Sequence, residues 1–166
     1  MASNETGKQK GNNLLRLFLA NIRSAKGKTS ELQSLILNYD IICLTETHLD
    51  DTIPSSYVTQ DRDKTVFRRD HTLCGGGILV AVTNSIKTKQ VDIDTLGEEM
   101  IILKIEPKTI ICCYYRPHVR LQNTENIRSI LWAVNQKFPD HILLLIRDEF
   151  SGHRLEKRKY KTIYPI

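Results

Sequence analysis

The sequence has 166 residues, of which 40% are hydrophobic and 26% are charged, and its formal net charge is +5. This length suits one domain with a sizeable core rather than two, and the composition excludes collagen-like and wholly disordered proteins. The four cysteines, at positions 43, 74, 112 and 113, lack the paired spacing of a zinc site. Cys112 and Cys113 are adjacent, so we expect them to fill the core on opposite faces of a strand.

Both ends of the sequence are polar. Residues 1–13 predict a disordered leader without the apolar core of a secretory signal, so we expect an intracellular chain in the cytoplasm or nucleus. The apolar run that follows, at 14–20, is far shorter than the roughly 20 residues of a membrane span, and we expect no membrane association. Residues 151–166 predict a basic tail, in which 153–161 hold five Lys/Arg and one Glu. This run is typical either of a solvated tail or of a nucleic-acid contact.

The first part of the predicted domain, which spans 14–150, has a strand-helix-strand pattern. Residues 14–21 (LLRLFLAN) predict a strand, and 29–38 place their apolar side chains at helix spacing. Residues 40–44 (DIICL) form an apolar run that is typical of a strand buried on both faces. The pattern predicts two parallel strands joined by a right-handed helical crossover.

The middle of the chain predicts four further strands, at 65–70, 75–83, 99–106 and 109–116. Only short polar segments separate these strands, so we expect antiparallel hairpins that form a meander.

The last predicted elements are a helix over 123–138 and a strand over 141–146 (HILLLI). Asn123 or Thr124 suits the N-cap. One helical face gathers the apolar side chains of Ile127, Ile130, Leu131, Val134 and Phe138. With the strand at 109–116, these elements predict a second strand-helix-strand unit.

Polar side chains lie at or just after the ends of four of the predicted strands: Asn21, Glu46, Tyr115 and Asp148. Open α/β sheets bind ligands at the carboxyl ends of parallel strands, so these four side chains are candidates for one site. Carboxylate and amide oxygens suit Mg²⁺, and Arg116 suits a phosphate. Each residue also has a structural interpretation: Glu46 suits a turn contact, Asn21 suits a bond to the loop backbone, and Tyr115 suits a surface position.

The segments ANIRS, DIICLTETHLD, RRD, GGGILVAV, CCYYRP and FPDHILLLIRD occur in this order between residues 14 and 148. Together they resemble the endonuclease/exonuclease/phosphatase domain, and most closely the apurinic-endonuclease-like domain of non-LTR retrotransposons. The resemblance implies a four-layer α/β sandwich of the DNase I-like type that cleaves phosphodiester bonds of DNA with Mg²⁺ or Mn²⁺. It also implies that Asn21 and Glu46 hold the metal, Tyr115 contacts the scissile phosphate and Asp148 orients the attacking water. The glycines at 75–77 precede a strand rather than a helix, which favours a tight turn over a P-loop.

The chain departs from the family pattern after residue 146. Where the family has Gly-Asp-Phe-Asn, this sequence has Arg147-Asp148-Glu149-Phe150, and no Ser-Asp-His motif follows. We therefore expect an incomplete domain with weak or absent catalysis, low stability and exposed strand edges. The alternatives are a non-catalytic mobile-element remnant that binds nucleic acid and a protein-interaction module. The oligomeric state stays open.

Overall fold

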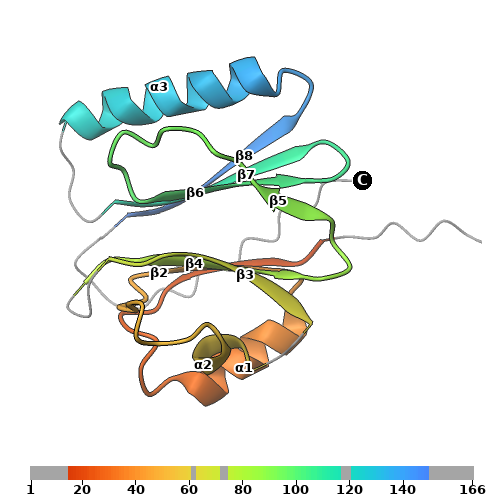
Figure 1. Cartoon of the computed structure of the whole chain (residues 1–166), viewed down its shortest axis with the longest axis vertical. Helices are drawn as coiled ribbons and strands as arrows, with labels where there is room; N and C mark the ends of the chain where they lie inside the picture. Colours follow the sequence, from red (N-terminus) through yellow and green to blue (C-terminus); the bar gives the residue numbers. More distant parts are fainter. Residues whose placement is uncertain (1–14, 61–62, 72–74, 117–120, 150–166) are drawn as a thin grey trace, which may run out of the picture.

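Two facing sheets, each covered by helices on its outer side, stack into four layers (Figure 1). This computed structural model describes residues 15–60, 63–71, 75–116 and 121–149. The arrangement confirms the predicted four-layer α/β sandwich. None of the helices in these ranges combines the length and hydrophobicity of a membrane-spanning segment. The expected leader (1–13) and basic tail (151–166) lie outside the described residues.

Each sheet has four strands and contains both parallel and antiparallel pairs. The first sheet has the order β1-β2-β4-β3, and the second has the order β5-β6-β7-β8. The first half of the fold comprises β1 (Leu17–Asn21), α1 (Thr29–Asn38), β2 (Ile41–Thr45), α2 (Ser56–Thr59), β3 (Lys64–Arg69) and β4 (Ile78–Thr83). The second half comprises β5 (Thr88–Gln90), β6 (Met100–Ile105), β7 (Thr109–Arg116), α3 (Leu121–Lys137) and β8 (Ile142–Glu149).

Both predicted strand-helix-strand units are confirmed. β1 and β2 pair in parallel across α1, with Leu17 opposite Ile41, and β7 and β8 pair in parallel across α3, with Thr109 opposite Ile142. All residues of β2 are buried, as predicted for a strand covered on both faces. β8 runs to Glu149 and therefore continues past the apolar run in which the predicted strand ended.

The predicted meander is wrong as a single unit, because its strands divide between the two sheets. β3 pairs with β4 in the first sheet, whereas β6 pairs with β7 in the second. The short strand β5, which the sequence pattern did not reveal, pairs with β6 at the edge of the second sheet. Strands buried on both faces have no polar side, so their pattern does not say which sheet they join.

The core forms three layers of side chains that follow the strand alternation. The layer between the sheets includes Cys43 and Cys113, and the layer under α3 includes Cys112. Cys112 and Cys113 therefore face opposite sides of β7 as predicted, and both are buried free thiols. Burial raises the pKa of the Cys112 thiol to about 12, because the apolar surroundings disfavour the thiolate.

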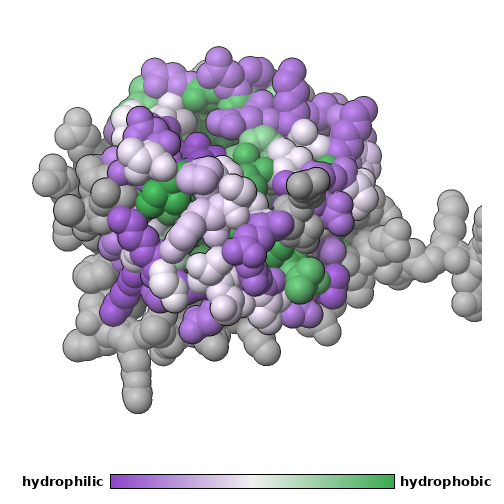
Figure 2. Space-filling model, turned by 60° about the horizontal axis from the view of Figure 1, so that its bottom comes forward, coloured by the Kyte–Doolittle hydropathy of each residue, from purple (hydrophilic) through white to green (hydrophobic). Residues whose placement is uncertain are grey.

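The helices pack through the faces that their sequence patterns indicated. In α3, Ile130 and Val134 are buried, and the remaining predicted residues of that face are partly buried against the same layer. The helix begins at Leu121, so Asn123 and Thr124 lie within it and the predicted N-cap is wrong. α1 has the predicted bounds. The surface on the α1 and α2 side is mostly polar, with hydrophobic side chains in small separate areas (Figure 2).

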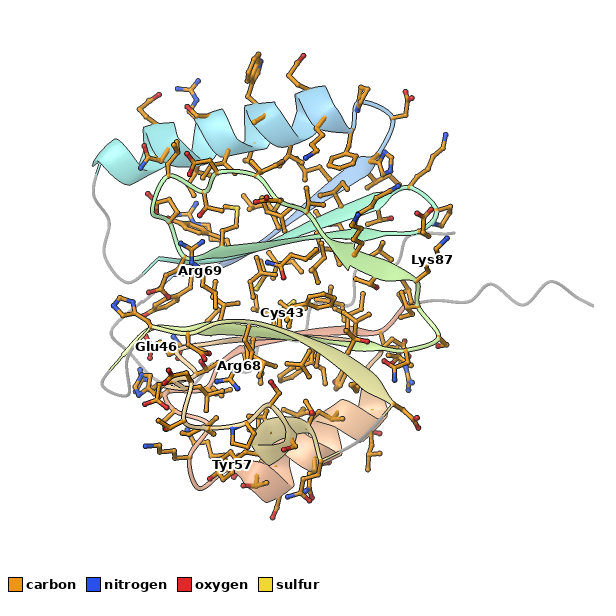
Figure 3. The ribbon with its side chains drawn as sticks, in the orientation of Figure 1. Cys43, Glu46, Tyr57, Arg68, Arg69 and Lys87 are labelled. Carbon is orange, nitrogen blue, oxygen red and sulfur yellow. The ribbon has the colours of Figure 1, made fainter. Side chains whose placement is uncertain are left out.

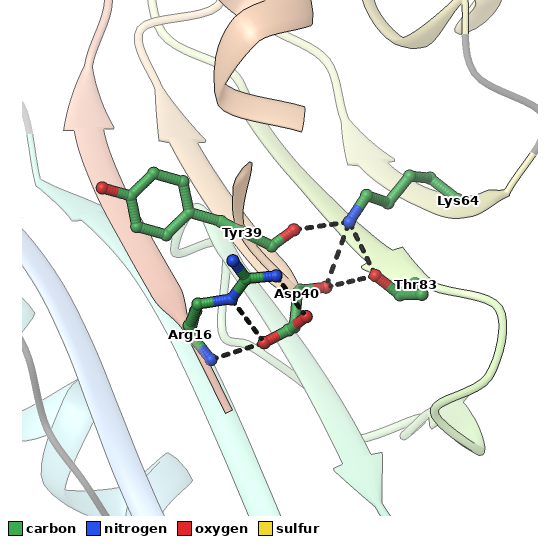
Figure 4. A network of polar contacts seen from close by, with 5 residues as sticks. All are labelled: Arg16, Tyr39, Asp40, Lys64 and Thr83. Carbon is green, nitrogen blue, oxygen red and sulfur yellow. Dashed lines mark hydrogen bonds and ion pairs between the residues drawn. The ribbon is translucent and has the colours of Figure 1, made fainter. Parts of the chain in front are cut away.

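A polar network ties the strands of the first sheet together at the amino end of β2 (Figure 4). The Asp40 carboxylate accepts hydrogen bonds from the backbone and side chain of Arg16, the shortest at 2.7 Å. Lys64 Nζ donates to the carbonyl of Tyr39 at 2.5 Å and to the hydroxyl of Thr83 at 2.7 Å. The network is structural, since it lies at the end of β2 opposite to Glu46.

Candidate active site

The candidate site lies at the carboxyl ends of the two parallel strand pairs. Glu46 follows β2 in the first sheet, and Tyr115 is near the end of β7 in the second. The Tyr115 hydroxyl donates a hydrogen bond of 2.6 Å to Glu46 Oε1 across the interface between the sheets. Tyr115 is 4% exposed and Glu46 is 7% exposed. Two residues that are distant in the sequence therefore meet, as the convergence of strand ends predicted.

The backbone around Glu46 is held on both sides. The Glu46 carbonyl accepts a hydrogen bond of 2.7 Å from the Ser24 amide, and the next residue, Thr47, donates its amide to the carbonyl of Gly77 at 3.3 Å. Glu46 has a φ of 51°, which is rare for a residue with a side chain. Unfavourable backbone conformations of this kind cluster at functional sites, where the surrounding contacts enforce them.

Asn21 lies on the neighbouring strand, where it pairs in register with Thr45, the residue before Glu46. Its Oδ1 accepts a hydrogen bond of 3.2 Å from the backbone amide of Arg23. The structural interpretation of Asn21 as a loop contact is therefore realised. An amide oxygen has two lone pairs, so one remains for a further partner.

Asp148 lies on β8 directly beside Tyr115 in the parallel register. The backbone of Asp148 therefore lies at the same level of the second sheet as that of Tyr115. Arg147 and Glu149 flank it within the strand. The residues that replace the Gly-Asp-Phe-Asn pattern of the family are thus strand residues as far as Glu149.

Two glycines pack tightly against the segment that follows Glu46, at the place where the sequence predicted a tight turn. Gly76 and Gly77 have φ values of 74° and 89°, which favour glycine. A Cβ atom on Gly77 would lie 2.6 Å from the hydroxyl of Thr47, and one on Gly76 would lie 2.7 Å from the carboxylate of Glu99. The Thr47 hydroxyl is buried and has no hydrogen-bond partner among the described residues.

Glu99 is the site residue that sequence reasoning missed. Its carboxylate accepts a hydrogen bond of 2.9 Å from the Gly77 amide and contacts His71 Nδ1, and its carbonyl accepts the Tyr115 amide at 3.0 Å. Glu99 therefore joins Gly77 to β7. No local pattern marks this role, because Glu99 precedes a strand and its partners are distant in the sequence.

The donor set fits a divalent ion of the magnesium type. Within the described ranges, no group of three or more His, Cys, Asp and Glu side chains forms a metal cluster. The Tyr115 hydroxyl donates to one carboxylate oxygen of Glu46. The second Glu46 oxygen and the remaining lone pair of Asn21 Oδ1 are hard ligands, and they come from adjacent strand ends. Mg²⁺ commonly takes one or two carboxylates and fills its remaining positions with water and substrate phosphate.

Comparison with solved structures shows the fold. The chain is similar to the 3′ phosphatase NExo from Neisseria bound to a product DNA hairpin, with a TM-score of 0.61 and 13% identity over 81% of this chain. It is also similar to the endonuclease domain of TRAS1, a telomere-specific non-LTR retrotransposon, with a TM-score of 0.56 and 19% identity over 81% of this chain. For the catalytic domain of Xenopus laevis APE2, the TM-score is 0.58 and the identity is 14% over 84% of this chain.

These similarities confirm the DNase I-like α/β fold that the sequence resemblance implied. The chain spans 57% of the NExo structure, 58% of TRAS1 and 60% of APE2. No protein-family model matches the sequence, and no curated protein matches it.

Proposed function

We propose that the chain is a phosphodiesterase domain of the endonuclease type, of retrotransposon origin, that acts on DNA with Mg²⁺ or Mn²⁺. The observation that carries this proposal is the buried contact between Tyr115 and Glu46 at the carboxyl ends of the parallel strands. The similarity to a DNA-bound phosphatase and to a retrotransposon endonuclease supports DNA as the partner.

In the proposed reaction, Glu46 and Asn21 would hold the ion, which when bound would stabilise charge on the phosphoryl oxygens as a Lewis acid. The Tyr115 hydroxyl, which donates to Glu46 in the structure, donates to a non-bridging oxygen of the scissile phosphate when DNA is present. Asp148, on the neighbouring strand, would orient the attacking water, as the resemblance implies. Glu99 fixes the position of Tyr115 through its carbonyl and that of Gly77 through its carboxylate.

The proposed activity is weak. Arg147 and Glu149 occupy the positions beside Asp148 where the family pattern has glycine and phenylalanine, and both lie within β8. A misplacement of about 1 Å in a catalytic group costs on the order of 100-fold in rate. We therefore propose that this chain cleaves DNA at least about 100-fold more slowly than a domain with the intact Gly-Asp-Phe-Asn pattern.

The test is nicking of supercoiled plasmid and cleavage of an oligonucleotide duplex with one abasic site, each in Mg²⁺ and in EDTA. Glu46→Gln keeps the size of the side chain but removes the charge, and we expect it to abolish the Mg²⁺-dependent rate. Lys87→Gln is the control, because Lys87 is exposed at the opposite end of the sandwich (Figure 3). Equal rates for the unmodified chain and Glu46→Gln would contradict the proposal.

The second candidate is a non-catalytic remnant that binds nucleic acid. The replacement of the residues on both sides of Asp148 favours it. Salt-sensitive DNA binding that Mg²⁺ does not affect, together with nicking equal to that of Glu46→Gln, would identify this function.

A further inference from the structure

Two adjacent arginines at the end of β3 have opposite environments. The Arg68 guanidinium donates to the Asp70 carboxylate at 2.6 and 3.0 Å, to the Ile53 carbonyl at 2.6 Å and to the Asp50 carbonyl at 2.9 Å. Its charge and most of its donors are therefore used within the fold. Arg69 makes one described hydrogen bond, from Nη1 to the Thr95 hydroxyl at 2.6 Å.

Arg69 is a partly buried cation without an ion-pair partner in the described part of the chain. Taking a guanidinium partly out of water is costly unless an anion or several acceptors compensate it. The single bond to Thr95 holds one end of the guanidinium and leaves Nε and Nη2 for another partner. Arginine is the side chain best suited to bind a phosphate through two parallel hydrogen bonds.

Arg69 also lines a polar cavity of about 560 Å³ between β3 and the segment that follows β5. Asp92 and Asp94 lie on the same cavity wall, and one oxygen of Asp94 already accepts the Leu96 amide at 2.8 Å. Neither carboxylate is within ion-pair distance of Arg69 among the described residues. The two carboxylates disfavour an anion between them, so an anion would bind at the free edge of the Arg69 guanidinium.

The strand register places Arg69 beside the candidate active site. Arg69 pairs with Ile78 on β4, and Ile78 pairs with Thr45 on β2, immediately before Glu46. Two inter-strand spacings therefore separate Arg69 from Thr45, about 10 Å. Figure 3 shows Arg69 and Glu46 at the same end of the sandwich, with Arg69 directed toward the second sheet. This distance is on the scale of the spacing between neighbouring phosphates of one DNA strand.

We propose that Arg69 binds a backbone phosphate of the DNA strand near the phosphate at the Glu46–Tyr115 pair. This inference rests on the proposed function, because it assumes that DNA occupies the candidate site. Thr95 positions the guanidinium, and Arg69 fixes the register of the strand without reading its sequence.

The test is equilibrium binding of a fluorescein-labelled DNA duplex in EDTA at several KCl concentrations, with the full chain. Arg69→Gln is expected to weaken binding about tenfold and to reduce the slope of log K against log salt by about one. Arg69→Lys keeps the charge but loses the planar pair of donors, so it is expected to retain the slope and lose part of the affinity. Lys87→Gln removes the same charge at the far end and is expected to leave both unchanged.

Equal slopes for Arg69→Gln and the unmodified chain, or equal losses in Arg69→Gln and Lys87→Gln, would overturn the inference. Circular dichroism checks that each variant folds, and Arg69→Lys provides the test if Arg69→Gln does not fold. Because binding is measured without metal, the result is independent of cleavage. If the chain does not nick DNA but Arg69→Gln reduces the salt slope, the proposed function is wrong and the phosphate contact of Arg69 stands. If the chain nicks DNA with Mg²⁺ but the slopes are equal, the proposed function stands and the phosphate contact of Arg69 is wrong.

Discussion

Replacing Tyr115 by phenylalanine tests whether the two sheets meet at the candidate site as described. The substitution removes the hydroxyl that donates to Glu46 at 2.6 Å, and both side chains are more than nine-tenths buried. Hydrogen bonds to charged groups contribute about 1.5–3 kcal/mol, and a buried carboxylate without its donor is destabilising. We expect Tyr115→Phe to lower the free energy of unfolding by about 2 kcal/mol.

The matched substitution Tyr57→Phe provides the control. Tyr57 is 36% exposed, and among the residues that the structure describes its oxygen accepts one long hydrogen bond, 3.4 Å, from the Gly27 amide. Its loss is expected to change stability by less than about 0.5 kcal/mol, as for most surface substitutions. Both variants therefore remove one phenolic oxygen, and only the environment differs.

The assay is urea denaturation under reducing conditions, followed by far-UV circular dichroism, with a double-mutant cycle between Tyr115→Phe and Glu46→Gln. In the double variant no charge is left without its donor, so the two effects are expected to be less than additive by about 1 kcal/mol or more. Additive effects, or a Tyr115→Phe variant as stable as Tyr57→Phe, would show that the contact does not form in solution.

Three further predictions concern the fold. Gly77→Ala is expected to lower the free energy of unfolding, measured in urea, by about 2 kcal/mol or more, because Gly77 has a φ of 89° and the new Cβ would lie 2.6 Å from the Thr47 hydroxyl. Gly75→Ala is the control and is expected to cost far less, because a Cβ on Gly75 meets nothing within 4 Å. The raised pKa of Cys112 predicts that the fold loses stability as the pH rises from about 9 toward 12, because in that window the thiol ionises in the unfolded state but not in the folded state. Thermal melts between pH 8 and 11 measure this loss, and Cys112→Ala is expected to show a flatter profile than the unmodified chain. β8 is an edge strand and its Leu145 is 41% exposed, so the chain is expected to self-associate. Light scattering measures this association, which Leu145→Lys is expected to reduce, and a monodisperse monomer of the unmodified chain would contradict the prediction.

Much of the local structure could be predicted from the sequence, because each segment carries its own burial pattern. The helical period of α3 identified the face that Ile130 and Val134 bury, and the adjacent pair Cys112 and Cys113 required opposite faces of a strand. The sheet to which β4 and β6 belong was not predictable in this way. Their apolar sequences record burial on both faces, whereas sheet membership depends on which distant strand each one meets.

The candidate site was predictable only where a general rule of the fold applied. Glu46 and Tyr115 were found because both follow strands whose carboxyl ends converge, although 69 positions separate them in the sequence. Glu99 escaped, because its importance comes from contacts with Gly77 and His71 that no local pattern encodes. The metal roles of Asn21 and Glu46 and the catalytic roles of Tyr115 and Asp148 remain predictions.

The most direct test of the proposed site is the position of a bound divalent ion, because it does not depend on how fast the chain cleaves DNA. Mn²⁺ at substoichiometric concentration broadens the amide resonances of nearby residues in a ¹H–¹⁵N NMR spectrum. We predict selective broadening of residues that follow β1 and β2, including Asn21, Glu46 and Thr47, and its loss in Glu46→Gln. Broadening centred elsewhere, or unchanged by Glu46→Gln, would contradict the account.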